Sequence, residues 1–597
     1  MECMMKRAGG FFILGMLICG GVTPAAAGTI AIVGGMVFDG TGAAARRGTI
    51  LIQDDRITAV GRDVTVPADA RVIDVHGMAV TPGLYDLHTH WGLEGTPADV
   101  PSIAHAYLVS GVTTVNDFNE ETEAFAPLRT WLVRMPAPHV NFAARISTPG
   151  GHGADWSDQD TTRWASTAAS GKAAIDSVVA YHPDLIKIFT DGWRYGRMPD
   201  DTSMNEQTLA AAVAQAHADH LKVMTHTVTV ERGLLAARAK VDSLAHSMQD
   251  RVLTSADIAT IRASGMGDIA TLAVYDPDKW RRVPEHKVAP NTRLFDNALK
   301  NVRKLYKAGV PIGVGTDAGM PATPHGESTL HELELLVRAG LTPAQALVAA
   351  TRVSATLQGQ QTDRGTIAPG MRADITVFDG RPWKHIADIH HVAMTMVDGR
   401  PLIGLGALPD QASGTGWPAP VPAGRLIDDF ERADGRSSLN TLRRDTMDWG
   451  QDRTEEVSGT MTRETGRGKI LFMAARMADK KDAYAGVAVP LSTGSVLPVD
   501  VTAYKGITLE IRGAACPSRL TVTGTVGATW SAPVNMTQGW QTIHVPFSAL
   551  QVVDPKVGRA WNGRDVTEVE IGQSCPAEHK SWLQADNLAF YSGGTSH

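Results

Sequence analysis

Apolar strand-like segments alternate with helical segments between residues 82 and 365, and this alternation restricts the possible folds more than any other feature. The segments are continuously apolar, which is typical of strands covered on both faces. Eight consecutive strand and helix units predict a (β/α)8 barrel of TIM type rather than an open doubly wound sheet. After a first strand leading into His88, the expected strands are 112–118, 140–146, 185–189, 222–225, 241–245, 269–274 and 312–316.

Two helices of this region have recognisable start signals. Ser203 to Glu206 is interpreted as a capping box before a helix over 209–218, and Thr342-Pro343 begins another helix. No GxGxxG or Walker motif competes with the barrel interpretation.

The regions on either side of the barrel have a different texture. Short β segments separated by turns occupy residues 28–81 and 366–404, and we expect the two flanks to pair into one small β-sandwich subdomain. Residues 405–425 are rich in proline and glycine and predict a linker. Residues 426–597 alternate between apolar and polar positions, which predicts an all-β sandwich domain.

The N-terminus resembles a secretory signal peptide. Lys6 and Arg7 precede an apolar stretch over residues 11–22, and Ala25 to Ala27 offer a cleavage site before Gly28. We therefore expect residues 1–27 to be removed and the mature chain to be periplasmic or secreted. No other segment approaches the length needed to span a membrane.

Charge argues against a nucleic-acid partner. The 56 Lys and Arg residues against 63 Asp and Glu give a net charge of −7, and no long basic run is present. A small-molecule or short-peptide substrate is the better expectation, and a homo-oligomer is expected.

Of the four cysteines, Cys3 and Cys19 would leave with the signal peptide. The remaining pair, Cys516 and Cys575, favours a structural disulfide in an exported protein, with two buried thiols as the alternative.

The sharpest chemical motif is His88-Thr89-His90, which follows the first expected strand. Residues i and i+2 of a strand share a face, so both imidazoles can chelate one metal ion at the mouth of a barrel. A pair of surface histidines is the alternative interpretation.

Lys187 lies inside the apolar run 185–189, where an unpaired ammonium group is disfavoured. Either the side chain reaches the barrel mouth, or its pKa falls and the neutral amine is modified. Addition of carbon dioxide would convert it to a carbamate anion able to bridge two metal ions.

Three further metal-capable residues stand at expected strand ends. His226 ends the strand 222–225, His246 follows the strand 241–245, and Asp317 follows the strand 312–316. Active sites of these barrels lie where the carboxyl ends of the strands meet.

The order HxH, Lys, His, His, Asp resembles the amidohydrolase superfamily. The phrases at 79–84, 315–318, 341–347 and 365–370 resemble its imidazolonepropionase-like branch, which includes Xaa-Pro dipeptidases. The resemblance covers about residues 29–404 and supports the barrel.

This resemblance implies a site for two divalent metal ions, zinc first, with manganese, cobalt or iron as alternatives. It places His88, His90 and Asp317 on one ion, His226 and His246 on the other, and carboxylated Lys187 between them with a bridging hydroxide as nucleophile. Asp317 would transfer the proton from that nucleophile to the leaving amine. The implied reaction is hydrolysis of an amide bond in dipeptides or N-acyl amino acids.

Substrate contacts are less well defined. His152, in a glycine-flanked loop, matches a histidine of this branch and is assigned to stabilising the oxyanion, with a solvent-facing loop histidine as the alternative. Many relatives carry Tyr or His where this chain has Val228. Arg194 and Tyr195 are candidate substrate contacts, Arg194 for a carboxylate, although both also suit a packing role.

The C-terminal region resembles the CIA30-type galactose-binding-like sandwich in its phrases at 427–431, 504–508, 539–548 and 583–588. Glycan contact is possible for such a fold, but its tryptophans are expected mainly in the core, namely Trp449, Trp530, Trp540, Trp561 and Trp582.

Two other functions stay open at this point. One is a mononuclear deaminase on the same barrel, which would not need Lys187. The other is a catalytically silent envelope protein whose sandwich binds glycan.

Overall fold

The computed structural model describes residues 28–92, 99–153, 162–192, 202–280, 291–408, 416–448, 454–466, 468–555, 559–577 and 579–593. The predicted leader lies outside these residues, as do Arg194 and Tyr195. Within the described residues, no helix has the length and apolar character needed to cross a membrane.

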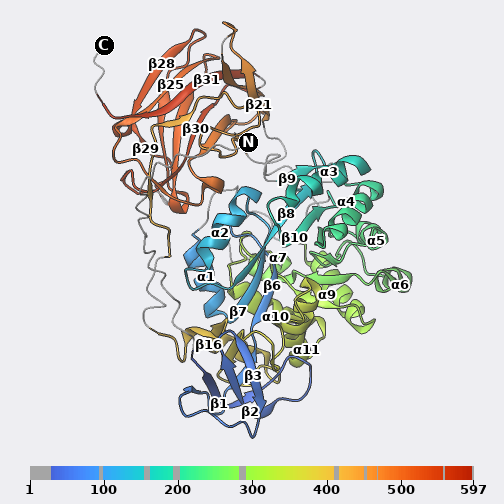
Figure 1. The fold of residues 1–597 in the computed structure, drawn as a ribbon. Helices are drawn as coiled ribbons and strands as arrows, with labels where there is room; N and C mark the ends of the chain where they lie inside the picture. The colour runs from blue at the N-terminus through green and yellow to red at the C-terminus, as the bar shows by residue number, and fades with distance from the viewer. Residues whose placement is uncertain are drawn as a thin grey trace, which may run out of the picture.

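The centre of the molecule is the predicted (β/α)8 barrel (Figure 1). Its parallel strands follow one another in chain order around the sheet, and a parallel bridge between Thr89 and Ala318 connects the first strand to the end of the last. A short extra strand, β9 (Thr162–Trp164), pairs with β8. The barrel strands are β6 (Leu84–Thr89), β7 (Val112–Asp117), β8 (His139–Ser147), β10 (Leu185–Phe189), β11 (Lys222–His226), β12 (Ser243–Leu244), β13 (Gly267–Ala270) and β14 (Ile312–Val314).

Helices surround the barrel and cover the outer face of its strands, which explains why the strands are apolar on both faces. They are α1 (Val100–Val109), α2 (Phe125–Leu132), α3 (Ala168–Val179), α4 (Glu206–Ala218), α5 (Val230–Arg238), α6 (Ser255–Ser264), α7 (Leu272–Tyr275), α8 (Pro277–Trp280), α9 (Thr292–Lys307), α10 (Glu327–Ala339), α11 (Pro343–Val348) and α12 (Ser354–Gln358). The helix predicted to begin at Thr342-Pro343 is α11, and Thr342 caps it with a capping box.

Two local predictions in the barrel were wrong. Residues 269–274 do not form one strand, because Glu332 accepts hydrogen bonds from the backbone N–H groups of Leu272 and Ala273 and stabilises the first turn of α7. The cap of α4 is Asn205 rather than Ser203. The hydroxyl oxygen of Ser203 instead accepts a hydrogen bond from the N–H of Gly192.

The two flanks of the barrel form one sheet, with the order β17-β16-β15-β5-β1-β2-β3 and β4 beside β1. Strand β5 pairs with both β1 and β15, so the N-terminal and C-terminal flanks meet there. The strands are β1 (Ile30–Val37), β2 (Arg46–Gln53), β3 (Arg56–Gly61), β4 (Arg71–Asp74), β5 (Ala79–Pro82), β15 (Ile375–Phe378), β16 (Val392–Val397) and β17 (Arg400–Gly404).

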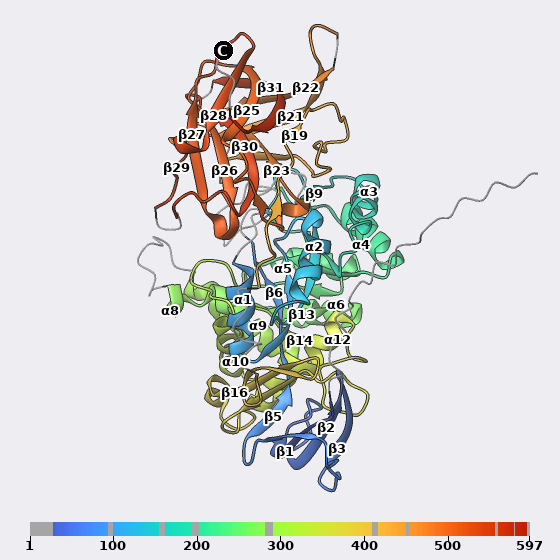
Figure 2. The ribbon, with the colours of Figure 1, turned by 60° about the vertical axis from the view of Figure 1, so that its left-hand side comes forward.

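The C-terminal region forms two further sheets with a shared apolar core, as predicted for an all-β sandwich (Figure 2). One sheet contains β18 (Val421–Pro422), β20 (Arg444–Met447), β23 (Ala485–Pro490), β24 (Val499–Asp500), β26 (Ser518–Gly524), β27 (Thr529–Val534), β29 (Gln551–Val552) and β30 (Val566–Gln573). The other contains β19 (Leu426–Asp428), β21 (Glu455–Thr462), β22 (Lys469–Arg476), β25 (Gly506–Gly513), β28 (Gln541–Pro546) and β31 (Lys580–Tyr591).

Details of this domain differ from the expectations. Val421–Pro422 lies within the predicted linker but pairs with β24 at a sheet edge, where proline is tolerated. Among the tryptophans expected in the core, Trp530 is fully buried, whereas Trp540, Trp561 and Trp582 are partly exposed. Trp449 lies outside the described residues.

Cys516 and Cys575 form a disulfide between positions 59 residues apart. It lies in the sandwich, and Cys575 belongs to the apolar core of that domain.

Candidate metal centre

Six side chains named by the sequence analysis converge inside the barrel mouth: His88, His90, Lys187, His226, His246 and Asp317. Each is at most 4% exposed. They come from β6, β10 and β11 and from the segments directly after β6, β12 and β14. They therefore lie together at the carboxyl end of the barrel strands.

The first group is His88, His90 and Asp317, whose ligand atoms lie within 4.8 Å of one another. One carboxylate oxygen of Asp317 lies 3.1 Å from Nε2 of His88 and 2.8 Å from Nε2 of His90. Asp317 has a φ of 62°, which is uncommon for a residue with a side chain. Such backbone strain is concentrated at functional sites.

The orientation of His88 depends on an irregularity in β6. Leu87 belongs to the apolar cluster inside the barrel, yet the next residue, His88, also reaches Lys187. The pairing of β6 with β7 shifts register between Asp86 and Thr89, and such a shift re-aims side chains. Nδ1 of His88 lies 2.8 Å from the carbonyl oxygen of Ala245, which leaves Nε2 directed toward Asp317.

The second group contains His226 and His246, whose ring centroids are 4.6 Å apart. Nδ1 of His246 is hydrogen-bonded to the hydroxyl of Thr271 at 2.6 Å. Nε2 of His226 is buried and has no hydrogen-bond partner within the described part of the chain. A buried polar atom of this kind normally has a partner, and a metal ion is one kind of partner that suits an imidazole nitrogen.

Lys187 lies beside the first group, and its charge also acts on His226 and His246 of the second group. Its Nζ lies 3.1 Å from Nε2 of His88 and 4.3 Å from the ring centroid of Phe118. Burial lowers the pKa of Lys187 to about 7, and Arg145 contributes in the same direction, whereas Asp317 opposes the shift. A substantial share of the amine is therefore neutral near pH 7.

The electrostatics of the cluster suit metal binding. Burial lowers the pKa of His88 to about 3 and holds the pKa values of His226 and His246 well below the ordinary range, so these imidazoles are neutral. Burial alone would raise the pKa of Asp317, but the two neighbouring histidines, His88 and His90, hold it well below its usual value. Neutral imidazoles beside a carboxylate are donors that fit zinc and related divalent ions.

A second group of metal-capable residues, His139, Asp374 and Asp398, lies within 4.8 Å of one another near the start of β8. Arg372 contacts Asp398 at 2.5 Å, and Arg364 lies 3.6 Å from Asp374. Because these cations already neutralise the carboxylates, this group suits an ion-pair network rather than a metal.

His152 lies at the same opening. Its ring centroid is 4.1 Å from that of His226 and 5.3 Å from that of Phe189, and the residue is 3% exposed. The solvent-facing alternative for His152 is therefore wrong. Val228, in contrast, packs into the apolar layer outside the barrel strands and does not replace the missing Tyr or His.

Sequence reasoning missed the residues that orient the ligands. Asp86 accepts hydrogen bonds from Thr316 and Thr329, both at 2.7 Å, and from the N–H of His88. Phe118 packs 4.6 Å from the ring of His88. Asp86 could have been found from the sequence, because an aspartate stands two residues before the HxH motif in an apolar strand. No local pattern marks Phe118.

The sequence model of the Amidohydrolase family matches residues 79–402, which is more than half of the chain. The chain is 25% identical over 362 residues to an imidazolonepropionase of Deinococcus deserti, covering 57% of this chain and 87% of that one. It is 26% identical over 389 residues to an imidazolonepropionase of Paracoccus denitrificans, covering 56% and 88%.

Solved structures agree on the fold. A putative prolidase from Bifidobacterium longum superimposes with a TM-score of 0.56 at 24% identity, covering 64% of this chain and 96% of that one. A Xaa-Pro dipeptidase with bound methionine gives a TM-score of 0.54 at 23% identity, covering 63% and 100%. The family match, the barrel and the converging donors together lead to one conclusion: the chain belongs to the amidohydrolase family and is a metal-dependent hydrolase.

Proposed function

We propose that this protein is an exported hydrolase with two divalent metal ions that cleaves the amide bond of dipeptides or N-acyl amino acids. The observation that carries the proposal is the burial of Lys187 beside His88 of the first group of donors, with the charge of Lys187 also acting on His226 and His246 of the second group. A single-ion deaminase on the same barrel would not need Lys187.

We propose that Lys187 carries a carboxyl group derived from carbon dioxide. The neutral amine forms an N–C bond with carbon dioxide and releases one proton, which gives a carbamate anion. Burial supports this step because it disfavours the ammonium form that cannot react. The resulting anion would compensate for the positive charge of two ions, which a free amine cannot do.

Bound divalent ions would polarise the scissile carbonyl and lower the pKa of a water molecule to near neutrality. His88, His90 and Asp317 would hold one ion, and His226 and His246 the other. Asp317 contacts His88 and His90 and is ionised, so it is suited to take up a proton and pass it to the leaving amine. His152, next to His226, is assigned to donate a hydrogen bond to the carbonyl oxygen.

The printed names of the relatives and similar folds include imidazolonepropionase, prolidase and Xaa-Pro dipeptidase. We take the proposed substrate class, dipeptides and N-acyl amino acids, from the names of the prolidase-like proteins. Arg194 and Tyr195 remain proposed contacts to the substrate, with Arg194 binding its carboxylate.

The test is a screen of the purified, metal-loaded protein against dipeptides, N-acyl amino acids and lactones. We expect release of a free amine from members of the first two classes. Metal analysis should return about two divalent ions per chain and identify them, with zinc expected first. A fully loaded sample with one ion per chain, or release of ammonia from nucleobases without peptide cleavage, would contradict the proposal.

Export, cleavage before Gly28 and a homo-oligomeric state are also proposed. N-terminal sequencing of protein recovered from the cell envelope tests the first two. Light scattering of the purified protein tests the third.

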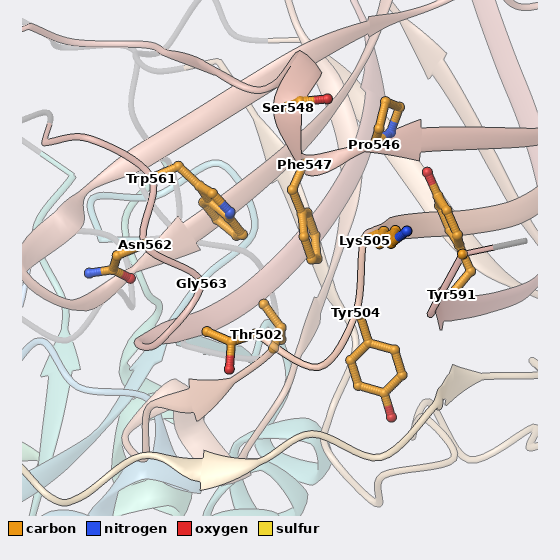
Figure 3. Close-up of a pocket in the computed structure, with 12 residues that line it drawn as sticks. Thr502, Tyr504, Lys505, Pro546, Phe547, Ser548, Trp561, Asn562, Gly563 and Tyr591 are labelled. Atoms are coloured by element: carbon orange, nitrogen blue, oxygen red, sulfur yellow. The ribbon is translucent and has the colours of Figure 1, made fainter.

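We further propose that the C-terminal sandwich is of the CIA30 type and contacts glycans. A pocket of about 660 Å³ between its loops supports this (Figure 3). Trp561 is partly exposed there, with its ring centroid 4.8 Å from that of Phe547, and Asn562 lies beside it. Exposed aromatic faces next to amide groups suit sugar rings. Glycan binding that is lost in Trp561→Ala and kept in Trp540→Ala would support this site.

A further inference from the structure

The segment 117–124, between strand β7 and helix α2, is buried along its whole length, with each residue at most 5% exposed. Its inner end touches the candidate metal centre. The ring centroid of Phe118 lies 4.6 Å from the ring centroid of His88 and 4.3 Å from Nζ of Lys187. The position of this segment therefore bears directly on two of the proposed metal ligands.

The same inner end also supports the chain that follows His90. One carboxylate oxygen of Asp117 accepts hydrogen bonds from the N–H of Trp91 at 3.1 Å and of Asn119 at 3.0 Å. The side-chain amide of Asn119 donates to the carbonyl oxygen of Gly92, and its oxygen accepts from Arg145 at 2.7 Å. Movement of the segment would disturb these contacts together.

The outer end of the segment is held by the C-terminal sandwich. Arg444 of strand β20 pairs with Glu121 at 2.8 Å, and both side chains are almost fully buried. Arg436 binds both carboxylate oxygens of Glu123, at 2.6 and 3.1 Å. Arg444 also pairs with Glu568 inside the sandwich, which ties the contact to the body of that domain.

A loop of the sandwich completes the contact. Gly494 packs so closely on Ala124 that a Cβ atom there would lie 2.4 Å from the Cα of Ala124. Two residues later, Val496 is fully buried within the apolar core of the barrel. Both views show the sandwich at the end of the barrel opposite the β1–β3 sheet (Figures 1 and 2). The two domains therefore share core at the end where the barrel strands terminate.

We propose that the sandwich completes the active site, with Arg444 and Arg436 as positioning residues that fix the segment 117–124 against His88, Lys187 and the chain after His90. The cations of the sandwich neutralise two buried carboxylates, Glu121 and Glu123, on a segment whose other end lies against the candidate metal centre. Loss of those cations would leave buried negative charge and displace the segment.

The test compares Arg444→Met with Arg443→Met in the full-length, metal-loaded protein. Arg443 is the matched control because it is the adjacent residue and is also buried. Its hydrogen bonds within the described residues stay inside the sandwich, to Asp428 at 2.6 and 3.0 Å and to the carbonyl oxygen of Arg432 at 3.2 Å. Hydrogen exchange of peptides covering 117–124 is the first readout, and it needs no substrate. The kinetic constants for amide hydrolysis are the second, and only this readout rests on the proposed function.

We expect Arg444→Met to increase exchange in the segment 117–124 at least tenfold and to lower kcat at least tenfold, with a smaller change in KM. Arg444→Lys should restore part of both values, because it retains a cation beside Glu121. Arg443→Met should leave both at the wild-type level. If Arg444→Met does not fold, Glu121→Gln breaks the same pair from the barrel side and should produce the same loss of protection.

Wild-type exchange in the segment 117–124 of Arg444→Met, or of Glu121→Gln where the first variant does not fold, would overturn the proposal. Equal losses in Arg443→Met would also overturn it, since they would indicate general weakening of the sandwich. If no amide substrate is found, the exchange result alone decides the proposal, so its failure is distinguishable from failure of the proposed function.

Discussion

Nζ of Lys187 lies 3.1 Å from Nε2 of His88 in the interior of the barrel, where neither group is accessible to bulk water. Nε2 of His88 is the nitrogen assigned to a metal ion, and an ammonium group of Lys187 at this distance would repel that ion. A carbamate anion on Lys187 would instead attract the bound ions.

Replacement of Lys187 by alanine should therefore remove metal and activity together. We expect Lys187→Ala to retain less than one ion per chain and to lose more than a hundredfold in kcat/KM, with partial rescue by a short carboxylic acid. Metal analysis and initial rates measure these effects.

Lys222→Ala is the control, because Lys222 lies on neighbouring strand β11 with its exposed side chain paired to Asp242. It should keep full metal content. Wild-type metal content in Lys187→Ala would contradict the carbamate.

The second prediction concerns Nε2 of His226, which is buried without a hydrogen-bond partner in the described part of the chain. His226→Asn should lower the metal content from two ions to one, because the variant removes a buried donor from the second group while His88, His90 and Asp317 stay in place. Activity should fall at least a hundredfold.

His217→Asn provides the comparison, since His217 is an exposed histidine of helix α4 that pairs with Asp242. It should bind two ions with unchanged rates. Two tightly bound ions in His226→Asn would exclude His226 as a ligand.

Much of the fold could be predicted from the sequence because strands buried on both faces leave a clear apolar pattern. Lys187 stood out because a charge interrupts such a strand, and His226 because it ends one. The structure brings these residues together because the carboxyl ends of all barrel strands lie at the same end of the barrel.

Contacts between distant parts of the chain could not be predicted in this way. The strand expected over 269–274 ends early because Glu332, 60 residues further along, stabilises a helical turn after it. The pairing of Arg444 with Glu121 likewise joins the sandwich to the barrel. The sequence pattern of neither domain indicates that it contacts the other. Local periodicity reports burial, but it does not report which buried partner a residue meets.

The disulfide between Cys516 and Cys575 should stabilise the sandwich more than the barrel, because both cysteines lie in that domain. We expect the double variant Cys516→Ser/Cys575→Ser to lower the free energy of unfolding of the sandwich by about 2–5 kcal/mol, chiefly because the unfolded chain gains freedom. Urea unfolding followed by tryptophan fluorescence measures the loss.

Labelling of Cys516 and Cys575 by a thiol reagent under denaturing conditions without reductant, located by peptide mapping, would show instead that the bridge does not form. An unchanged unfolding curve in the double variant would show that the bridge does not stabilise the domain.

Asp268, which is not among the proposed metal ligands, provides a test of pH dependence. It is fully buried on β13, where burial raises its pKa to about 7, and the hydroxyl of Ser247 donates to it at 2.9 Å. The unfolded chain releases this proton near pH 4, so between about pH 4 and 7 the folded state binds the additional proton. The contribution of Asp268 to stability therefore falls by about 1.4 kcal/mol per pH unit across that range and is constant above it.

Asp268→Asn removes this titration while keeping the shape of the side chain. The free energy of unfolding of the variant minus that of the wild type should therefore rise from about pH 4 to 7 and level off above pH 7. Urea unfolding of both proteins at the same series of pH values measures this difference, in which the other titrating groups cancel. A difference that does not change with pH would mean that the Asp268 carboxyl is already ionised in the folded protein.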